Sequence, residues 1–100
     1  MRVRYTLPAL ADLAAILDYI AVHSPQGARR VHARLKAITE LLLLHPLIGR
    51  RTNDPAFRRM TVTSYPYLIF YELTENEIII HAIRHSARDP SAMPDADSSA

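Results

Sequence analysis

The dipeptide Ser24-Pro25 constrains the fold more than any other feature, because it divides one long stretch of helical periodicity, residues 8–44, into two parts. Serine is a favoured N-cap, and proline is tolerated in the first turn of a helix, so a second helix is predicted to begin at Pro25. The joint at His23 and Ser24 is too short for any arrangement other than an antiparallel pair of helices. The sequence therefore predicts a helical hairpin.

Each predicted helix has one apolar stripe. The first begins at Pro8 and extends to about Val22, and the second extends from Pro25 to Leu44, where His45-Pro46 ends it. The stripe of the first helix consists of Leu10, Leu13, Leu17 and Ile20, and that of the second of Val31, Leu35, Ile38 and Leu42. Both helices are expected to pack on the same surface.

Short segments rich in β-branched and aromatic residues indicate strands on both sides of the helices. They are residues 2–6, 57–63, 67–73 and 77–84. Because short turns separate the last three, they are predicted to form an antiparallel meander. The order β-α-α-β-β-β defines an α+β fold, in which the helical hairpin packs on one face of a four-stranded antiparallel sheet. Residues 1–89 form the single expected domain, and residues 90–100 form a flexible acidic tail.

The strand at residues 67–73 is apolar on both sides. Leu68 and Phe70 point one way, and the other apolar side chains point the opposite way: Tyr67, Ile69, Tyr71 and Leu73. This strand is therefore either central and buried on both sides, or part of a second face that awaits a partner.

Composition excludes several kinds of protein. Without cysteine there is no disulfide framework, no thiolate zinc site and no cysteine nucleophile, which suits the reducing cytoplasm. No apolar run approaches the roughly 18 residues that a membrane span requires, and Asp12 and Asp18 interrupt the N-terminal region where a signal peptide would be apolar. Neither a membrane nor a cofactor is expected.

The charges suggest an anionic partner. Residues 1–88 contain 12 basic and 7 acidic side chains, a balance of +5, whereas residues 89–100 contain three aspartates and no base. Eleven of the twelve bases are arginine, which binds phosphate or carboxylate in a bidentate manner. A GC-rich genome would produce the same bias without a functional cause.

Four stretches resemble the ParE/RelE superfamily of toxins from type II toxin–antitoxin systems. They are DLAAILDYI at residues 12–20 followed by Ser24-Pro25, HPLIGR at 45–50, YLIFY at 67–71 and RHSARD at 84–89. The resemblance implies a small bacterial toxin, of the kind also called plasmid stabilisation proteins. Its partner would be a ParD-like antitoxin with a ribbon-helix-helix domain and a helical tail, and the two would form a hetero-oligomer.

The superfamily divides by target. RelE-like members cut mRNA on the ribosome, which requires a proton acceptor, a proton donor and cations around the phosphorane. ParE-like members inhibit DNA gyrase and need no such set. The lysine-rich loop and C-terminal tyrosine of many ribonuclease members are missing here, so a gyrase inhibitor that is not an enzyme is favoured. A ribosome-dependent mRNA endoribonuclease and a non-toxic module that binds only its antitoxin remain alternatives.

The candidate target-binding residues lie at the ends of two strands. They are Arg58, Arg59, Arg84, His85 and Arg88. His85, Arg84 and Arg59 are the catalytic candidates in the ribonuclease alternative, because imidazole titrates near neutral pH. Arg58 and Arg59 face opposite sides of a strand, so only one can share a site with His85. His85 could instead satisfy a local backbone group, and Arg88 could pair with Asp89.

Two further features concern metals and the antitoxin. His81 and His85 lie about 13 Å apart on an extended strand, too far for one metal ion, so no metal site is expected. Around the end of the second helix, either the Leu47-Ile48 loop folds back over the leucines, or an amphipathic antitoxin segment docks on them. The residues assigned to antitoxin binding are Leu41, Leu43, Leu44, Tyr67 and Tyr71.

Overall fold

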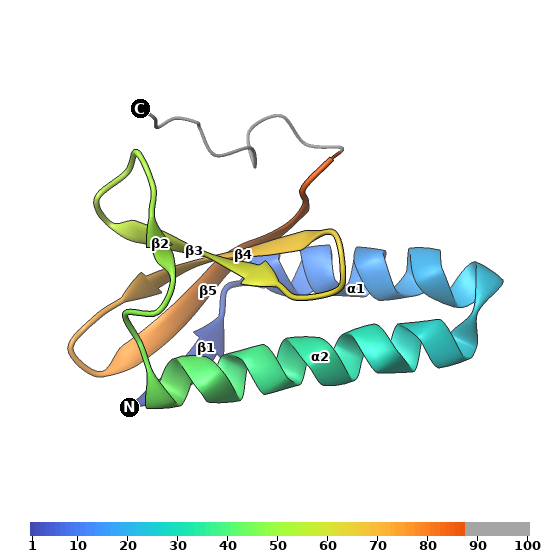
Figure 1. The fold of residues 1–100 in the computed structure, drawn as a ribbon, viewed down its shortest axis with the longest axis horizontal. Coiled ribbons are helices and arrows are strands. Elements are labelled where there is room, and N and C mark those ends of the chain that lie inside the picture. The colour runs from blue at the N-terminus through green and yellow to red at the C-terminus, as the bar shows by residue number, and fades with distance from the viewer. Residues whose placement is uncertain (88–100) are drawn as a thin grey trace.

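A five-stranded sheet with two helices on one of its sides forms the structure, a computed structural model that describes residues 1–87 (Figure 1). The strands lie in the order β1-β5-β4-β3-β2. The elements are β1 (Arg2–Tyr5), α1 (Leu7–His23), α2 (Pro25–Leu44), β2 (Arg50–Arg51), β3 (Phe57–Val62), β4 (Tyr67–Leu73) and β5 (Glu77–His85). The α+β class and the layer of helices on one face are as predicted. The expected tail, residues 90–100, lies outside the described residues.

Side-chain caps set where the helices begin. The Thr6 hydroxyl accepts a hydrogen bond from the Ala9 N–H at 3.2 Å, and the Ser24 hydroxyl accepts one from the Gly27 N–H at 2.8 Å. Each cap satisfies a donor that the first turn leaves without a partner. The second helix has the predicted bounds, and the first is longer by one residue at each end.

The predicted meander is present, since β3 pairs antiparallel with β4, and β4 with β5. Two expectations about the rest of the sheet are wrong. The first strand lies parallel to β5, with Arg2 opposite Glu77 and Tyr5 opposite Ile80, and a fifth strand, β2, pairs with β3. Because both helices and three other strands lie between β1 and β5 in the chain, no local feature fixes the relative direction of these two strands.

A β-bulge in β5 changes which side chains face the helices. Tyr71 lies opposite Ile80, but Phe70 lies opposite Ala82, which leaves His81 as the extra residue. An extra residue reverses the alternation of the side chains that follow it. As a result Ile80 and Ile83 are both buried, although three positions separate them.

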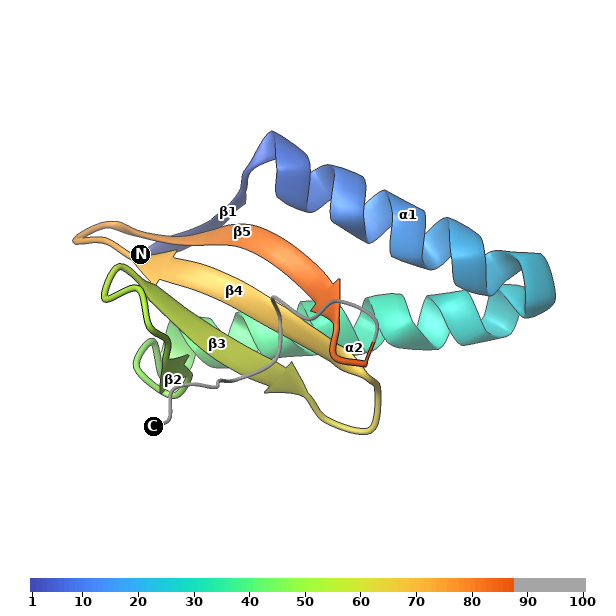
Figure 2. The same cartoon turned by 90° about the horizontal axis from the view of Figure 1, so that it is seen from above.

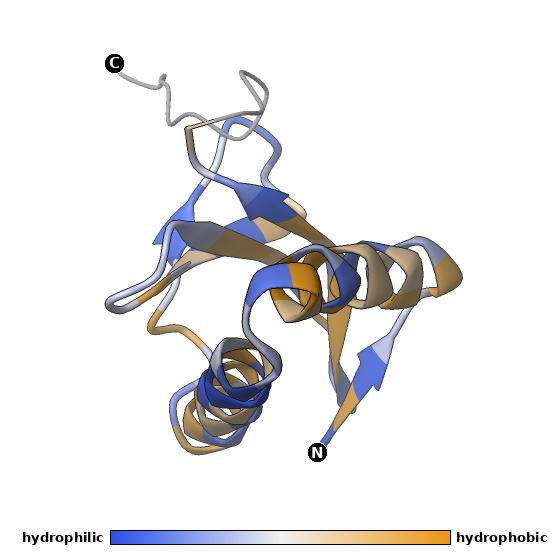
Figure 3. Ribbon diagram, turned by 90° about the vertical axis from the view of Figure 1, so that its right-hand side faces the viewer, coloured by the Kyte–Doolittle hydropathy of each residue, from blue (hydrophilic) through white to orange (hydrophobic). Residues whose placement is uncertain are grey.

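The core lies between the sheet and the helices, which share one side of it (Figure 3). The whole predicted stripe of α2 is buried, whereas α1 buries only Ala9 completely. Viewed from above, the sheet lies in front of α2, and α1 lies beside β5 (Figure 2). There the Asp12 carboxylate accepts a hydrogen bond from the Ile83 N–H at 3.0 Å, which satisfies a donor on the strand edge. We call the sheet surface turned away from the helices the open face.

Candidate functional site

Arg58 and Arg59 lie on opposite faces of β3, as expected. Arg58 is opposite Tyr71, whose ring belongs to the core, and Arg59 is opposite Phe70. The Arg58 guanidinium donates hydrogen bonds to the Gly49 carbonyl at 2.8 Å and the Leu47 carbonyl at 3.3 Å. Arg58 thus holds the loop that follows α2, a structural role that sequence reasoning did not identify.

The Arg59 side chain lies on the open face and is only half-buried, yet its Nε is shielded from solvent. Within residues 1–87 this atom has no hydrogen-bond partner. A shielded donor without a partner costs about 1–3 kcal/mol. A ligand or partner that supplied a hydrogen-bond acceptor to Arg59 Nε would remove this cost.

A hollow of about 290 Å³ lies on the open face and is lined by Phe57, Phe70, His81, Ala82 and Arg84. His81 Nε2 lies 2.9 Å from a Glu72 carboxylate oxygen, and the Phe57 and His81 rings meet edge to face with centroids 4.8 Å apart. Sequence reasoning missed this cluster, since it considered His81 only as a metal ligand. The bulge that directs His81 to this face has no sequence signal strong enough to reveal it.

His85 and Arg84 lie on opposite sides of the sheet. Arg84 is opposite Leu68 and lines the hollow, whereas His85 is opposite the core residue Tyr67. The His85 ring meets the Tyr67 ring edge to face, with centroids 5.5 Å apart, and its Nδ1 accepts a hydrogen bond from the Ala87 N–H. The group His85, Arg84 and Arg59 is therefore divided, with both arginines on the open face and the histidine on the other. Arg88 lies outside the described residues.

Among the residues assigned to antitoxin binding, the tyrosines and the leucines differ in exposure. Tyr71 is fully buried and Tyr67 nearly so, which makes both part of the core and corrects their assignment to a contact surface. Leu41 is half-buried, and Leu43 and Leu44 are exposed. The Leu47-Ile48 loop does not cover Leu43 and Leu44, because these two side chains remain 39% and 75% exposed.

The Tyr71 hydroxyl fixes the loop after α2. It donates a hydrogen bond to the Pro46 carbonyl at 2.7 Å and accepts one from the Gly49 N–H at 3.0 Å. Burial raises the pKa of Tyr71, although the Gly49 hydrogen bond and the charge of Arg58 oppose the shift. A side chain at position 49 would lie only 2.5 Å from the Tyr71 hydroxyl oxygen, so the loop depends on Gly49.

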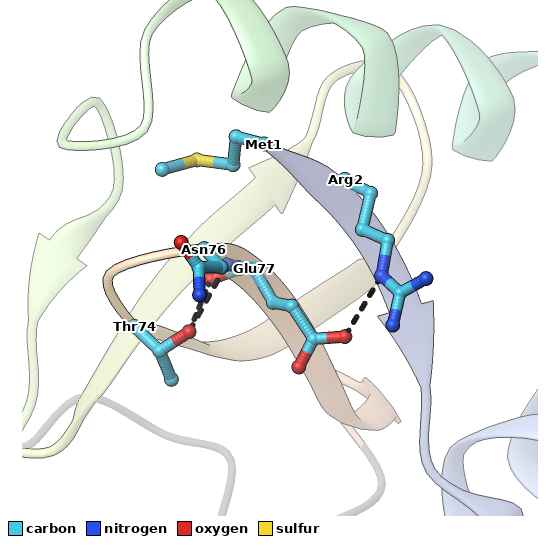
Figure 4. A pocket seen from close by; sticks show the side chains of 5 residues that line it. All are labelled: Met1, Arg2, Thr74, Asn76 and Glu77. Carbon is cyan, nitrogen blue, oxygen red and sulfur yellow. Dashed lines mark hydrogen bonds and ion pairs between the residues drawn. The ribbon is translucent and has the colours of Figure 1, made fainter.

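A second hollow, of about 560 Å³, lies where β1 meets the turn before β5 (Figure 4). In Figure 4 the Arg2 and Glu77 side chains point toward one another, and their ion pair measures 3.1 Å. Arg4 also binds Glu77, at 3.2 Å, and its hydrogen bond is the main reason that the pKa of this carboxyl is lowered. Because Glu77 is already paired with both arginines, these ion pairs connect β1 to β5, and the carboxylate is not available as a charged binding site.

Two kinds of site find no support in residues 1–87. No three or more of their histidine, aspartate and glutamate side chains are grouped so that they could hold a metal ion. Neither helix has the length and apolar character that crossing a membrane requires. The open face, with its arginines and aromatic rings, is the candidate target-binding surface.

Two helices packed on a five-stranded, mostly antiparallel sheet are the fold of small α+β toxins, and sequence comparison specifies the family. Residues 3–90 match a family described as the ParE toxin of the type II toxin-antitoxin system parDE. The chain belongs to this family.

Individual relatives agree with this assignment. The chain is 41% identical over 87 residues to Toxin RelE2 of Caulobacter vibrioides, which covers 87% of this chain and 97% of the relative. It is 29% identical over 92 residues to Putative toxin Y4kP of Sinorhizobium fredii, covering 92% and 96%.

Solved structures share the fold. The chromosomal ParDE system of P. aeruginosa matches with a TM-score of 0.73 and 26% identity, covering 85% of this chain and 95% of that one. YafQ of E. coli matches with a TM-score of 0.56 over 85% and 92%, but at 16% identity the likeness concerns the fold alone. A ParDE system pairs a toxin with an antitoxin, and this chain is accordingly the toxin of such a pair.

Proposed function

We propose that this toxin acts by binding and inhibiting DNA gyrase through its open face, and that its cognate antitoxin is ParD-like. The observation that supports a binding mode over catalysis is the division of the candidate catalytic residues. His85 packs against Tyr67 on the helix side, whereas Arg84 and Arg59 face the other way. A proton carrier on the wrong side of a sheet cannot serve a phosphate held by these arginines.

The open face suits an anionic protein surface. Arg59 has a shielded Nε that lacks an acceptor within residues 1–87, and Phe57 and Phe70 supply aromatic area beside it. Aromatic and arginine side chains contribute most of the energy in many interfaces. A carboxylate-bearing partner would satisfy the arginine and cover the rings at the same time.

A ribosome-dependent ribonuclease is the second candidate, and one observation favours it. The His81 imidazole is oriented by the Glu72 carboxylate and lines the same hollow as Arg84. A carboxylate that fixes an imidazole is a common arrangement for proton transfer. His81, rather than His85, would then be the general base.

Expression of the chain without antitoxin distinguishes these candidates. Gyrase inhibition predicts filamentation, DNA-damage signalling and inhibition of supercoiling by purified bacterial gyrase. A ribonuclease predicts translation arrest with cleaved transcripts, and absence of any phenotype favours a module that binds only its antitoxin.

Variants sharpen the test. Arg59→Met should weaken gyrase inhibition by about tenfold or more, because a central interface arginine is lost, whereas Arg30→Met on the exposed surface of α2 should have little effect. Transcript cleavage that is lost in His81→Ala but retained in His85→Ala would reject the gyrase proposal in favour of the ribonuclease.

A further inference from the structure

Four cationic side chains lie within eight residues on the exposed side of α2. They are Arg29, Arg30, Arg34 and Lys36, and we call them the α2 basic face. Within residues 1–87 none of the four forms an ion pair with a carboxylate. Positive charge that is concentrated and not neutralised attracts anionic partners.

The placement of these cations does not stabilise the helix. The helix macrodipole favours acidic residues in the first turn and basic residues in the last, and α2 has neither. Arg30 and Arg34 lie four positions apart on one side of the helix, where like charges repel each other. Glu40 follows Lys36 by four positions, yet the two form no ion pair. The cations therefore cost helix stability rather than add to it, which supports a role in binding.

The α2 basic face consists of two rows. With about 3.6 residues per turn, Arg29 and Lys36 lie nearly in line along the helix. Arg30 and Arg34 form a second line about a third of a turn away, and the rows together occupy about 10 Å of the helix axis. The exposed positions between the rows carry uncharged side chains, two of them small: Gln26, Ala33 and Ala37.

This face lacks the features of several other kinds of contact surface. From Pro25 to Ala37 no large apolar side chain of α2 is exposed, because Val31 and Leu35 are buried in the core. Protein interfaces are anchored by aromatic or other large side chains, and helices that lie on membranes need an apolar face. Single-stranded nucleic acids bind where bases stack on aromatic rings, and no Phe, Tyr or Trp occurs in this part of α2. A ligand that is bound through phosphate groups alone fits the face best.

Duplex DNA offers phosphates in a matching arrangement. The major groove of B-form DNA is about 12 Å wide and admits an α-helix, with one phosphate strand along each side. The major groove of A-form RNA is too narrow for a helix to enter. We propose that the α2 basic face binds duplex DNA, with the strip between the rows directed into the major groove and each row against the phosphates of one strand. Because phosphates carry no sequence information, this binding depends on salt far more than on base sequence.

DNA binding by α2 goes beyond the proposed function and does not depend on it. The helices lie on one side of the sheet and the open face is the other side, so the two surfaces can be occupied at the same time (Figure 3). Loss of Arg30 alone therefore leaves the contacts of the open face with gyrase unchanged.

The test measures binding of the purified full chain to a short fluorescent DNA duplex, by anisotropy at several salt concentrations. Two double variants each replace one row: Arg29→Gln with Lys36→Gln, and Arg30→Gln with Arg34→Gln. Each row variant should raise Kd about tenfold or more at about 0.1 M salt, and should lower the slope of log Kd against log salt by about 2. An RNA duplex of the same sequence should bind about fivefold more weakly, or less tightly still, than the DNA.

The matched control removes the same number of charges elsewhere. Arg50→Gln with Arg51→Gln replaces two exposed cations of β2 and should raise Kd less than about twofold. Thermal unfolding verifies that the variants fold. The variant that lacks Arg30 and Arg34 should be at least as stable as the unmodified chain, because a repulsive pair is removed. If one row variant does not fold, the other row carries the test.

The remaining outcomes contradict the proposal. If the unmodified chain does not bind DNA, or if the β2 variant loses as much affinity as the row variants, the α2 basic face is not a DNA-binding surface. Equal or tighter binding of the RNA duplex rejects the placement of α2 in a major groove. If the row variants bind DNA normally but lose affinity for gyrase or the antitoxin, the face contacts a protein instead. None of these results changes the outcome of the Arg59→Met assay, which tests the proposed function separately.

Discussion

The two faces of the sheet differ in how completely their side chains are satisfied. On the helix side, Ile69, Ile80 and Ile83 are buried, and the polar groups of Tyr71 and Arg58 have backbone partners. On the open face, the side chains of the hollow are exposed or half-buried, and Arg59 Nε lacks a partner within residues 1–87. The helix side therefore stabilises the fold, and the unsatisfied side chains of the other side support the proposal that the open face binds a target.

The largest expected effect compares neighbouring residues of β4 that point to opposite faces. Ile69→Ala should lower the free energy of unfolding by about 2–5 kcal/mol, because it leaves a cavity in the core. Phe70→Ala removes more atoms but should cost less, since Phe70 is only half-buried. Urea unfolding of both variants measures the contrast, and an equal or larger loss for Phe70→Ala would show that the open face is part of the core.

On the helix side, Tyr71→Phe tests whether the hydrogen bonds of the buried Tyr71 hydroxyl stabilise the fold. The variant leaves the Pro46 carbonyl and the Gly49 N–H without their partner and should cost about 1–3 kcal/mol. Because burial raises the pKa of Tyr71, its hydroxyl stabilises the fold below pH 10.0 and this contribution is lost as pH rises through the higher folded pKa. The free energies of unfolding of the unmodified chain and of Tyr71→Phe should therefore converge at strongly alkaline pH. A difference between them that does not change with pH would contradict this role of the hydroxyl.

On the open face, Arg59→Met should have a smaller effect of opposite sign. Removing a shielded donor without a partner should leave stability unchanged or raise it by up to about 1 kcal/mol. Toxicity in cells that lack antitoxin should fall in the same variant. Denaturation measures the stability of the variant, and growth assays measure its toxicity. A marked loss of stability would assign Arg59 a structural role.

The smallest effect concerns Glu77, which joins β1 to β5 through Arg2 and Arg4. Its pKa is lowered from 4.5, mainly by the Arg4 hydrogen bond, so the pair stabilises the fold above pH 4.5 and the contribution is lost as pH falls through the folded pKa. Glu77→Gln should be less stable at neutral pH, and the difference should shrink in acid and in high salt. A difference independent of pH would mean that the ion pairs are not its cause.

Features that depend on adjacent residues could be predicted from the sequence. Ser24 and Pro25 lie next to the helix that they start, and the bounds Pro25–Leu44 followed directly. The meander could also be predicted, because its turns are short and its strands are rich in β-branched and aromatic residues.

Features that depend on distant pairing could not be predicted. The two arginines of β2 form a strand only because Arg58 and Arg59 lie opposite them. Likewise, the alternation of side chains along β5 is interrupted by the bulge at His81. Which of Arg84 and His85 faces the helices could therefore be learned only from the structure. The sequence could therefore place Arg59, Arg84 and His85 along the chain but not show that both arginines lie on the open face and His85 on the other.

The pairing of β1 with β5 has a consequence for the order in which the protein is completed during synthesis. Residues 2–5 leave the ribosome early, but their hydrogen-bonding partners, residues 77–80, are made late. Contacts between distant parts of a chain form slowly and only after both parts exist. Until then the nascent chain lacks its finished sheet, so β1 can take its place only after β5 has been made.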